Sequence, residues 1–552
     1  MIIEQTKPIL TTGVNHSVSF DEFKSEVMTD YILACLSREV SLTGRKEVLT
    51  GKAKFGIFGD GKELPQIALA KVFENGDFRA GYYRDQTFAL ATGIVSVEQL
   101  FGQLYANPSL EEDPHSGGRQ MNNHFATRNL HPDGSWKNLT KQKNSAADNS
   151  PTASQMIRAL GLAMASKKYR ALQDSIGENN FSINGNEICF ATIGDASTSE
   201  GLFWEVINAG GVLQVPLIVS IWDDGYGISV PKKLQTTKSS ISEVLKGFQR
   251  DEKGNGYDIY VVKGWNYPQL VATYKMAADK TRKTHIPAIV HVEELTQPQG
   301  HSTSGSHERY KGAERLQWEK EHDCNYKFKQ WILENKIATQ EEIDIIENDA
   351  KKIVAEKKKI SWTKFHQPIL DEIKEVIDLF RKIAIDSKVK ESIQEKENEL
   401  LNAIDPMRRD VFKVVTDVLI LTKDEKHTAI EQLKNWRAEQ LQINEERYSS
   451  YQHSNSALSP LKLPIIAAQY EEKPSVVSGY QVLNACFDAN FERDKKILAF
   501  GEDVGFIGDV NQAFAGLQTK YGKDRIYDCG IREASIMGEG IGLAMRGLRL
   551  GL

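Results

Sequence analysis

The feature that most constrains the fold is a strand, a helix and a second strand between residues 187 and 222. EICFATIG (187–194) and LIVSIW (217–222) are apolar without alternation, which is typical of strands buried on both faces. The segment between them has a helical apolar face. Strands joined by a helix run parallel, so this stretch predicts a βαβ unit whose strands end at one edge of a sheet.

Two further apolar runs extend this pattern, YDIYVVKG (257–264) and PAIVHVEEL (287–295). They are separated from the first unit, and from each other, by helix-length segments, as in doubly wound proteins. We therefore expect residues 20–335 to form an α/β domain, a doubly wound parallel sheet with flanking helices.

The chain changes character after this domain. Residues 336–465 are rich in charged, amphipathic helical segments, and Pro368 and Pro406 are expected to punctuate them. We interpret this region as a helical connector without catalytic residues. A second α/β pattern begins at residue 470 and stops at Leu552. Since so short a unit buries little surface, we expect residues 470–552 to be the start of a second domain in a truncated chain.

Composition excludes several classes of protein. With 40% hydrophobic residues, 26% charged residues and a net charge of −6, the chain is an ordinary folded protein without the basic surplus of a nucleic-acid binder. The strongest apolar run, VLQVPLIVSIW, is about half a membrane span, and the N-terminus lacks a secretory pattern. The five scattered cysteines contain no CxxC pair, which favours a reducing compartment. We expect a cytoplasmic protein without membrane or nucleic-acid partners.

Acidic turns follow both strands of the first unit. Asp195 comes directly after the first strand and Asp224 after the second, so parallel geometry brings both to one crevice. Two carboxylates with a carbonyl from the turn after Asp224 would suit Mg²⁺ or Ca²⁺. Ser197 and Glu200 have capping-box spacing and predict a helix start there. Acidic residues are also common turn formers, and the spacing alone leaves both interpretations open.

Several ordered motifs resemble one enzyme family. GDASTSEG followed by WDDGYGIS is similar to the thiamine diphosphate signature of the α subunit of 2-oxo-acid dehydrogenase decarboxylating components. The other matching stretches are YYRDQ (82–86), GGRQMNNHF (117–125), SPTASQ (150–155), GHSTSGSHERY (300–310) and, from the β subunit, FGEDVGF (500–506) and KYGKDRIYDCGIREASIMGEGIG (520–542). The chain therefore resembles a fusion of α and β subunits of the branched-chain 2-oxoisovalerate type, with the thiamine diphosphate-binding fold.

The resemblance implies roles for individual residues. Asp195 and Asp224 would bind Mg²⁺ through their side chains and Tyr226 through its carbonyl. The catalytic residues would be His301, which contacts cofactor and substrate, Glu533, which hydrogen-bonds the thiamine pyrimidine, and Glu502, a supporting carboxylate. The residues implied to bind thiamine diphosphate are Tyr83, Arg84, Ser150, Thr152, Gly194, Asp195, Ala196, Asp224, Tyr226, His301 and Glu533.

The chain departs from the family pattern at three places near this site. Asp224 stands where asparagine is usual, and Trp222 where branched-chain enzymes carry an arginine. Thr296-Gln297-Pro298-Gln299 replaces a Tyr-Arg pair upstream of His301, so the anchoring of that loop needs another source. Ser302 matches a serine that kinases modify in mitochondrial relatives.

The implied reaction is oxidative decarboxylation of a branched-chain 2-oxo acid with reductive acylation of a lipoyl group. The implied partners are a lipoylated dihydrolipoyl acyltransferase core and a second copy of the chain, in an α2β2-like homodimer. Pyruvate is the alternative substrate, and a non-catalytic remnant is the alternative class. A Mg²⁺ phosphotransferase is disfavoured, because no P-loop lysine motif occurs.

Overall fold

The computed structural model describes residues 19–303, 305–450 and 452–551. Its central element is a parallel six-stranded sheet in the order β2-β1-β3-β4-β8-β7. The strands are β1 (Phe78–Ala80), β2 (Asn144–Ser145), β3 (Cys189–Gly194), β4 (Leu217–Trp222), β7 (Asp258–Lys263) and β8 (Ala288–Glu293). The predicted doubly wound α/β fold is confirmed.

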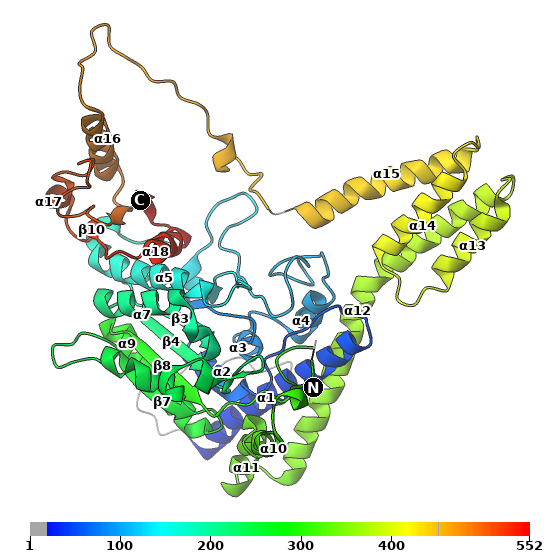
Figure 1. The fold of residues 1–552 in the computed structure, drawn as a ribbon, viewed down its shortest axis with the longest axis horizontal. Coiled ribbons are helices and arrows are strands. Elements are labelled where there is room, and N and C mark those ends of the chain that lie inside the picture. Colours follow the sequence, from blue (N-terminus) through cyan, green and yellow to red (C-terminus); the bar gives the residue numbers. More distant parts are fainter. Residues whose placement is uncertain (1–18, 304, 451, 552) are drawn as a thin grey trace.

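Helices cover both faces of this sheet (Figure 1). On one face lie α5 (Ser154–Ala171) and α7 (Gly201–Leu213), and on the other α2 (Glu63–Lys71), α9 (Tyr267–Thr284) and α11 (Cys324–Glu334). The smaller or peripheral elements are α1 (Phe20–Leu49), α3 (Gln86–Ala91), α4 (Val97–Leu104), α6 (Gln173–Ile176), α8 (Ile241–Val244), α10 (Ala313–Glu321) and the short hairpin β5 (Tyr226–Gly227) and β6 (Val230–Pro231). Each face of the sheet thus has its own apolar core, and only the strand ends are left for ligands.

The predicted helix start at Ser197 is wrong. A 3₁₀ turn occupies Ala196–Ser199, and α7 begins at Gly201 without a side-chain cap. The reason is local, because the Asp195 carbonyl accepts hydrogen bonds from the Thr198 amide and the Thr198 hydroxyl, at 3.1 and 2.6 Å. These bonds close a tight turn directly after β3 and hold Asp195 at the sheet edge.

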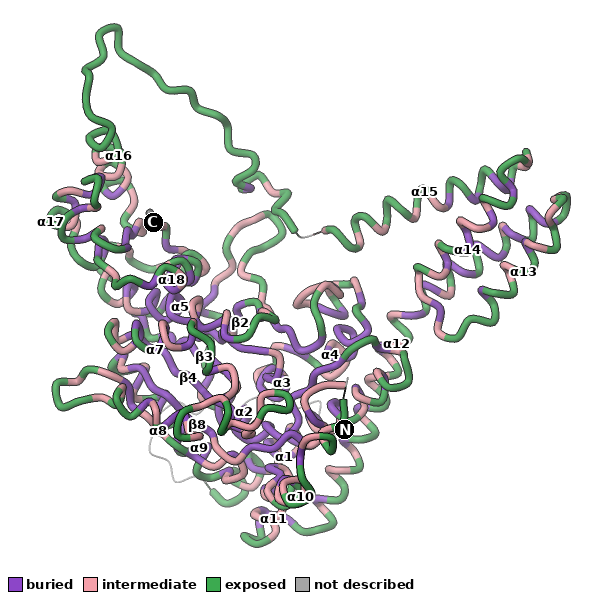
Figure 2. Tube along the Cα trace, viewed as in Figure 1, coloured by how far each residue is buried: buried purple, intermediate pink, exposed green. Residues whose placement is uncertain are grey.

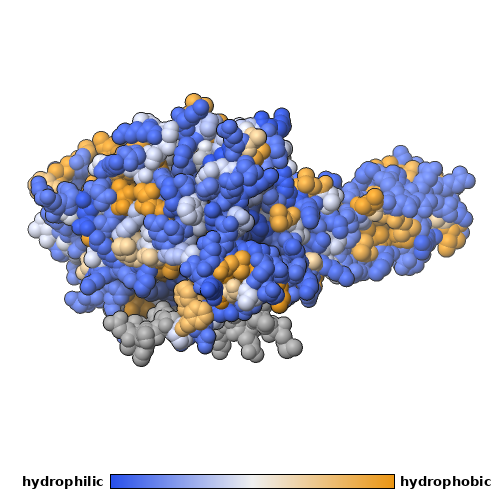
Figure 3. Space-filling view, turned by 90° about the horizontal axis from the view of Figure 1, so that it is seen from below, coloured by the Kyte–Doolittle hydropathy of each residue, from blue (hydrophilic) through white to orange (hydrophobic). Residues whose placement is uncertain are grey.

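A helical arm follows the first domain. It consists of α12 (Gln340–Ala384), α13 (Lys390–Leu401), α14 (Arg408–Leu421) and α15 (Thr428–Ser449). The long helix α12 also packs against α1 and α4, so it connects the arm to the body. Figure 1 shows the arm projecting from the body, and Figure 3 shows its surface as mostly hydrophilic with apolar patches.

Pro368 does not end a helix as predicted, because it lies inside α12. A proline in a helix removes one hydrogen bond, and here packing offsets that cost on both sides. Residues before it contact α1 and α4, while Phe380 after it belongs to the arm's own apolar core with Val415 and Leu433. None of the helices in the described ranges combines the length and apolarity that crossing a membrane requires.

An exposed linker over residues 452–478 leads to the second α/β unit (Figure 2). That unit has a parallel sheet in the order β10-β9-β11. Its elements are α16 (Gly479–Arg493), β9 (Ile497–Gly501), α17 (Leu517–Tyr521), β10 (Ile526–Asp528), α18 (Glu533–Met545) and β11 (Arg549–Gly551).

The second unit is docked onto the first through α18 and α5. A side chain at Gly542 would collide with the backbone of α5, so the two helices approach at backbone distance. Beside this contact the buried guanidinium of Arg546 pairs with Glu187 at 2.7 Å. Leu498 and Leu543 belong to the same apolar core as one face of the large sheet. The short unit therefore completes its core against the first domain.

Candidate cofactor site

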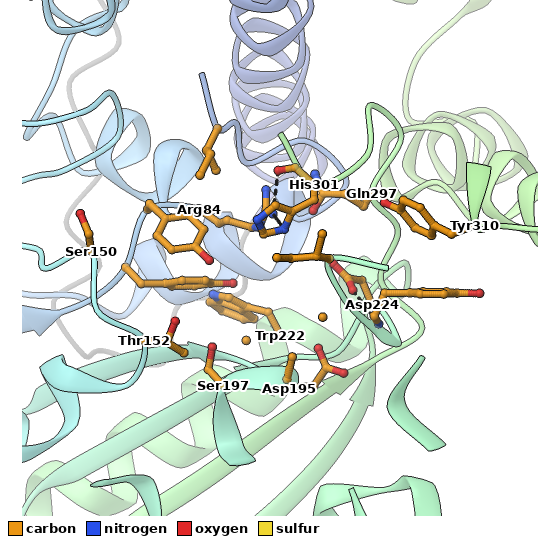
Figure 4. Close-up of a pocket in the computed structure, with 18 of the residues that line it drawn as sticks. Arg84, Ser150, Thr152, Asp195, Ser197, Trp222, Asp224, Gln297, His301 and Tyr310 are labelled. Atoms are coloured by element: carbon orange, nitrogen blue, oxygen red, sulfur yellow. Dashed lines mark hydrogen bonds between the residues drawn. The ribbon is translucent and has the colours of Figure 1, made fainter. Parts of the chain in front are cut away.

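A cavity of about 460 Å³ lies at the carboxyl ends of the central strands. Segments that follow β1, β3, β4 and β8 line it, as expected for the ligand crevice of a parallel sheet. The predicted residues that line this cavity are Tyr83, Arg84, Ser150, Thr152, Gly194, Asp195, Ala196, Asp224, Tyr226 and His301. Figure 4 labels six of them, and their side chains come from several different elements: Arg84, Ser150, Thr152, Asp195, Asp224 and His301. The fold thus brings together the cofactor-binding residues predicted within the first domain.

Asp195 carries a carboxylate that is buried at the cavity wall. It is 5% exposed, and its Oδ2 accepts no hydrogen bond from the described residues. Burial raises the pKa of this carboxyl well above its ordinary value, and the negative charges of Asp223 and Asp224 raise the pKa further. A buried polar atom without a partner is costly, so this oxygen is suited to receive a cation.

Asp224 has a different environment, because both of its oxygens are occupied. Its Oδ2 pairs with the Lys62 ammonium at 2.8 Å, and its Oδ1 accepts the Tyr226 amide at 3.1 Å. Burial alone would raise the pKa of Asp224, but the charge and hydrogen bond of Lys62, followed by the charge of Arg84, lower it below its ordinary value. Asp224 is therefore ionised, and the ammonium group of Lys62 compensates its negative charge.

Asp223 holds the turn that carries Asp224 and Tyr226. Its Oδ1 accepts the Gly225 amide at 2.9 Å. Its Oδ2 lies 2.9 Å from the Lys232 ammonium and 3.1 Å from Nε2 of the buried His291. Asp223 is thus a structural acid, and it is distinct from the two carboxylates that line the cavity.

Arg84 and His301 contact each other at one side of the cavity (Figure 4). Nη2 of Arg84 donates to Nδ1 and to the carbonyl of His301 at 2.9 and 3.0 Å, and Nη1 donates to the Phe58 carbonyl at 2.8 Å. Burial, followed by the positive charge of Arg84, lowers the pKa of His301 to about 4. His301 is therefore neutral near pH 7, and because Nδ1 accepts from Arg84 its proton is assigned to Nε2.

The loop that carries His301 is anchored by residues that the motifs did not indicate. Nη1 of Arg45, on α1, donates to the carbonyls of Gln299 and Ser302 at 2.6 and 3.3 Å. The Gln299 amide donates to Asp60 Oδ2 at 3.0 Å. Arg45 thus provides the additional anchor that the segment Thr296-Gln297-Pro298-Gln299 led us to expect, and nothing in its local sequence signals this role.

Trp222, which is expected to stand where branched-chain enzymes carry an arginine, lies in the cavity wall. Its indole Nε1 donates to Asp85 Oδ1 at 3.3 Å. Asp85 is neutralised by Arg79, which also pairs with Asp148 at 2.9 Å. Trp222 therefore lines the cavity as a buried wall that is fixed by an internal ion network.

Glu502 and Glu533 are not brought to this cavity within one copy of the chain. Both are exposed, Glu502 directly after β9 and Glu533 as the first residue of α18. The following part of α18 is occupied by its packing on α5. The predicted catalytic glutamates thus lie on the surface of the second unit, available to another molecule.

Comparison with known proteins defines the class. The model of the dehydrogenase E1 component family matches residues 45–369, which is more than half of the chain. The model of the transketolase pyrimidine-binding domain matches residues 477–551. The chain therefore belongs to the dehydrogenase E1 component family, the thiamine diphosphate-dependent components of 2-oxo-acid dehydrogenases. It joins an α-type unit and a β-type pyrimidine-binding unit in one polypeptide, as the motifs predicted.

Individual relatives match one unit each. The α subunit of 2-oxoisovalerate dehydrogenase from Bacillus subtilis is 24% identical over 294 residues, 53% of this chain and 77% of the relative. The α subunit of the pyruvate dehydrogenase E1 component from Rickettsia felis is 29% identical over 192 residues, 34% of this chain and 54% of the relative. The β subunit of the pyruvate dehydrogenase E1 component from Mycoplasma genitalium is 44% identical over 73 residues, 13% of this chain. The chain spans 22% of that β subunit's length.

Proposed function

We propose that the cavity binds the diphosphate end of thiamine diphosphate together with Mg²⁺. The observation that carries this proposal is the buried, unpartnered Oδ2 of Asp195, which lies at the cavity beside a second carboxylate. In the described part of the chain, no three His, Cys, Asp or Glu side chains are grouped to hold a metal by themselves. The remaining ligands would be the Tyr226 carbonyl and phosphate oxygens, which Mg²⁺ accepts readily.

The other cavity residues have complementary roles in this proposal. The Arg84 guanidinium donates to the Phe58 and His301 carbonyls, and on ligand binding it would donate to phosphate oxygens in their place. Its planar arrangement of donors suits phosphate oxygens. Neutral His301 would present its Nε2 proton to an oxygen of the substrate. Bound thiamine diphosphate would supply the electron sink for decarboxylation. The chain would thus supply binding, orientation and a hydrogen-bond donor.

The two glutamates of the second unit would act in another copy of the chain. We propose a homodimer in which Glu533 of one copy completes the cavity of the other, with Glu502 in support. The exposure of Glu533 supports this, as does its position between Ile531 and Met537, which are 83% and 56% exposed. Such exposed apolar residues beside a functional acid are suited to an interface.

The proposed reaction is oxidative decarboxylation of a branched-chain 2-oxo acid, with the acyl group passing to the lipoyl group of an acyltransferase core. The Bacillus subtilis relative, named for 2-oxoisovalerate, supports this choice, because its match covers 53% of the chain. The pyruvate dehydrogenase relatives support pyruvate as the second candidate.

The test is a steady-state assay of the purified chain with thiamine diphosphate, Mg²⁺ and an artificial electron acceptor. We expect kcat/KM for 3-methyl-2-oxobutanoate to exceed that for pyruvate by roughly tenfold, the discrimination that an additional methyl or methylene contact provides. A preference for pyruvate would refute the branched-chain assignment. Turnover of neither substrate by protein with bound cofactor would refute both substrate assignments.

A further inference from the structure

Lys62 is a buried cation that contacts two residues of the cavity wall, Asp224 and Gln297, and its three ammonium protons all have partners. Its side chain is 1% exposed. Its Nζ lies 2.8 Å from Asp224 Oδ2, 2.7 Å from Gln297 Oε1 and 3.2 Å from the Thr296 carbonyl. An ammonium group has three donors, so this environment leaves none for a ligand. Lys62 is therefore built into the protein and is not placed to bind phosphate.

The backbone around Lys62 is shaped for this contact. Gly61 has φ of +84°, and a Cβ there would collide with the Thr296 carbonyl, so glycine is required on both counts. Asp60 holds the Gln299 amide from the same side. Residues 60–62 thus bind and fix residues 296–299, which precede His301.

The balance of charge explains why a cation is needed here. Three carboxylates meet at the ends of β4 and β3, and Asp223 is already neutralised by Lys232 and bound by His291. The charges of Arg84 and Lys311 also act on Asp224, but Lys62 is the cation in direct contact with it. Without Lys62, Asp224 would be a buried carboxylate that has lost its ion-pair partner. An unpaired buried charge is strongly destabilising, whereas a paired one is tolerated.

We propose that Lys62 is a positioning residue that serves as the built-in counter-ion of Asp224. The pair keeps Asp224 aligned at the cavity, while Asp195 keeps an oxygen without a hydrogen-bond partner that a cation can contact. This inference rests on the proposed Mg²⁺ site. The inference requires that the effects of Lys62 and Asp224 depend on each other. The test therefore replaces each residue alone and both residues together.

The first measurement is a double-mutant cycle on the unfolding of protein without metal or cofactor. Lys62→Met and Asp224→Asn are each expected to lower stability, because each leaves the other residue buried without its partner. The combined variant is expected to be more stable than the sum of the two losses predicts. Additive losses would overturn the proposal. The pair Lys71 and Asp30, 2.8 Å apart and outside the cavity, supplies the matched control through Lys71→Met and Asp30→Asn.

The second measurement is titration with Mn²⁺ alone, followed by electron paramagnetic resonance. Lys62→Met is expected to tighten Mn²⁺ binding by roughly tenfold, since it frees a second carboxylate and removes a nearby positive charge. Lys62→Gln, which keeps a hydrogen-bond donor, is expected to show the same gain with a smaller loss of stability. The combined variant should return toward wild type, and Lys71→Met should not change binding.

A purely structural role for Lys62 would leave Mn²⁺ affinity unchanged or weaker in Lys62→Met, and that result would overturn the proposal. The proposed function fails separately. If wild-type protein binds Mn²⁺ with the expected variant pattern but binds no thiamine diphosphate, the cofactor assignment is refuted and the counter-ion assignment stands.

Discussion

The imidazole of His301 is held neutral by its surroundings, and this has a consequence for pH. Its pKa is lowered to about 4 by burial and then by Arg84, against an ordinary value of 6.5. Between these values the unfolded chain binds a proton that the folded protein does not. The contribution of His301 to stability is therefore full above pH 6.5 and decreases as the pH falls toward 4.

Chemical denaturation across pH 4 to 7.5 checks this prediction. We expect the stability of wild type to fall more steeply with decreasing pH than that of His301→Gln, in which this group no longer titrates. His285, whose pKa burial also lowers to about 4, is present in both proteins and cancels in the comparison. Parallel pH profiles for the two proteins would show that His301 titrates normally.

Among single residues, the sequence predicted the acidic side chains of the cavity but not Lys62, the partner of Asp224. Asp195 directly follows β3 and Asp224 lies two residues after β4, and parallel topology then places them at one edge. Lys62 lies in a short turn before α2, and its contact with Asp224 spans 162 positions. No periodicity or local motif marks such a contact, and the same holds for Arg45.

Among the elements, the contact of α5 with α18 decides how the second unit is held. Gly542 faces the α5 backbone, so Gly542→Val is expected to separate the helices and destabilise the docked unit by about 1–3 kcal/mol. Amide hydrogen exchange should rise in α18 and in β9 to β11. Gly479→Ala is the control, because a Cβ there meets nothing within 4 Å. Unchanged exchange in Gly542→Val would show that the helices do not depend on this approach.

The elements that periodicity predicted are those with enough residues to show it. Strands β3, β4, β7 and β8 each have six residues, and their apolar runs are visible in the sequence. β3, β4 and β8 are almost entirely buried, whereas β7, at the edge of the sheet, is only partly buried. Strand β1 has three residues and β2 has two, with polar side chains that tertiary contacts bury. Runs this short contain no detectable period, so two strands of the main sheet could not be predicted.

For the whole molecule, the separation of Glu533 from the cavity predicts complementation between copies. Asp195→Ala and Glu533→Gln are each expected to be inactive. In an equimolar mixture after subunit exchange, half of the dimers are mixed, and each mixed dimer has one intact site out of two. Activity should therefore return to about a quarter of wild type. A site formed within one copy would give no recovery in the mixture.

The central claim is that the cavity at the carboxyl ends of β3 and β4 binds thiamine diphosphate with a divalent cation at Asp195. Calorimetric titration of wild-type protein with thiamine diphosphate, with and without Mg²⁺, tests it most directly. We expect Mg²⁺-dependent binding that weakens roughly a hundredfold or more in Asp195→Ala, since the variant loses a direct metal ligand. Absence of binding by wild type, or equal affinity in Asp195→Ala, would contradict the claim.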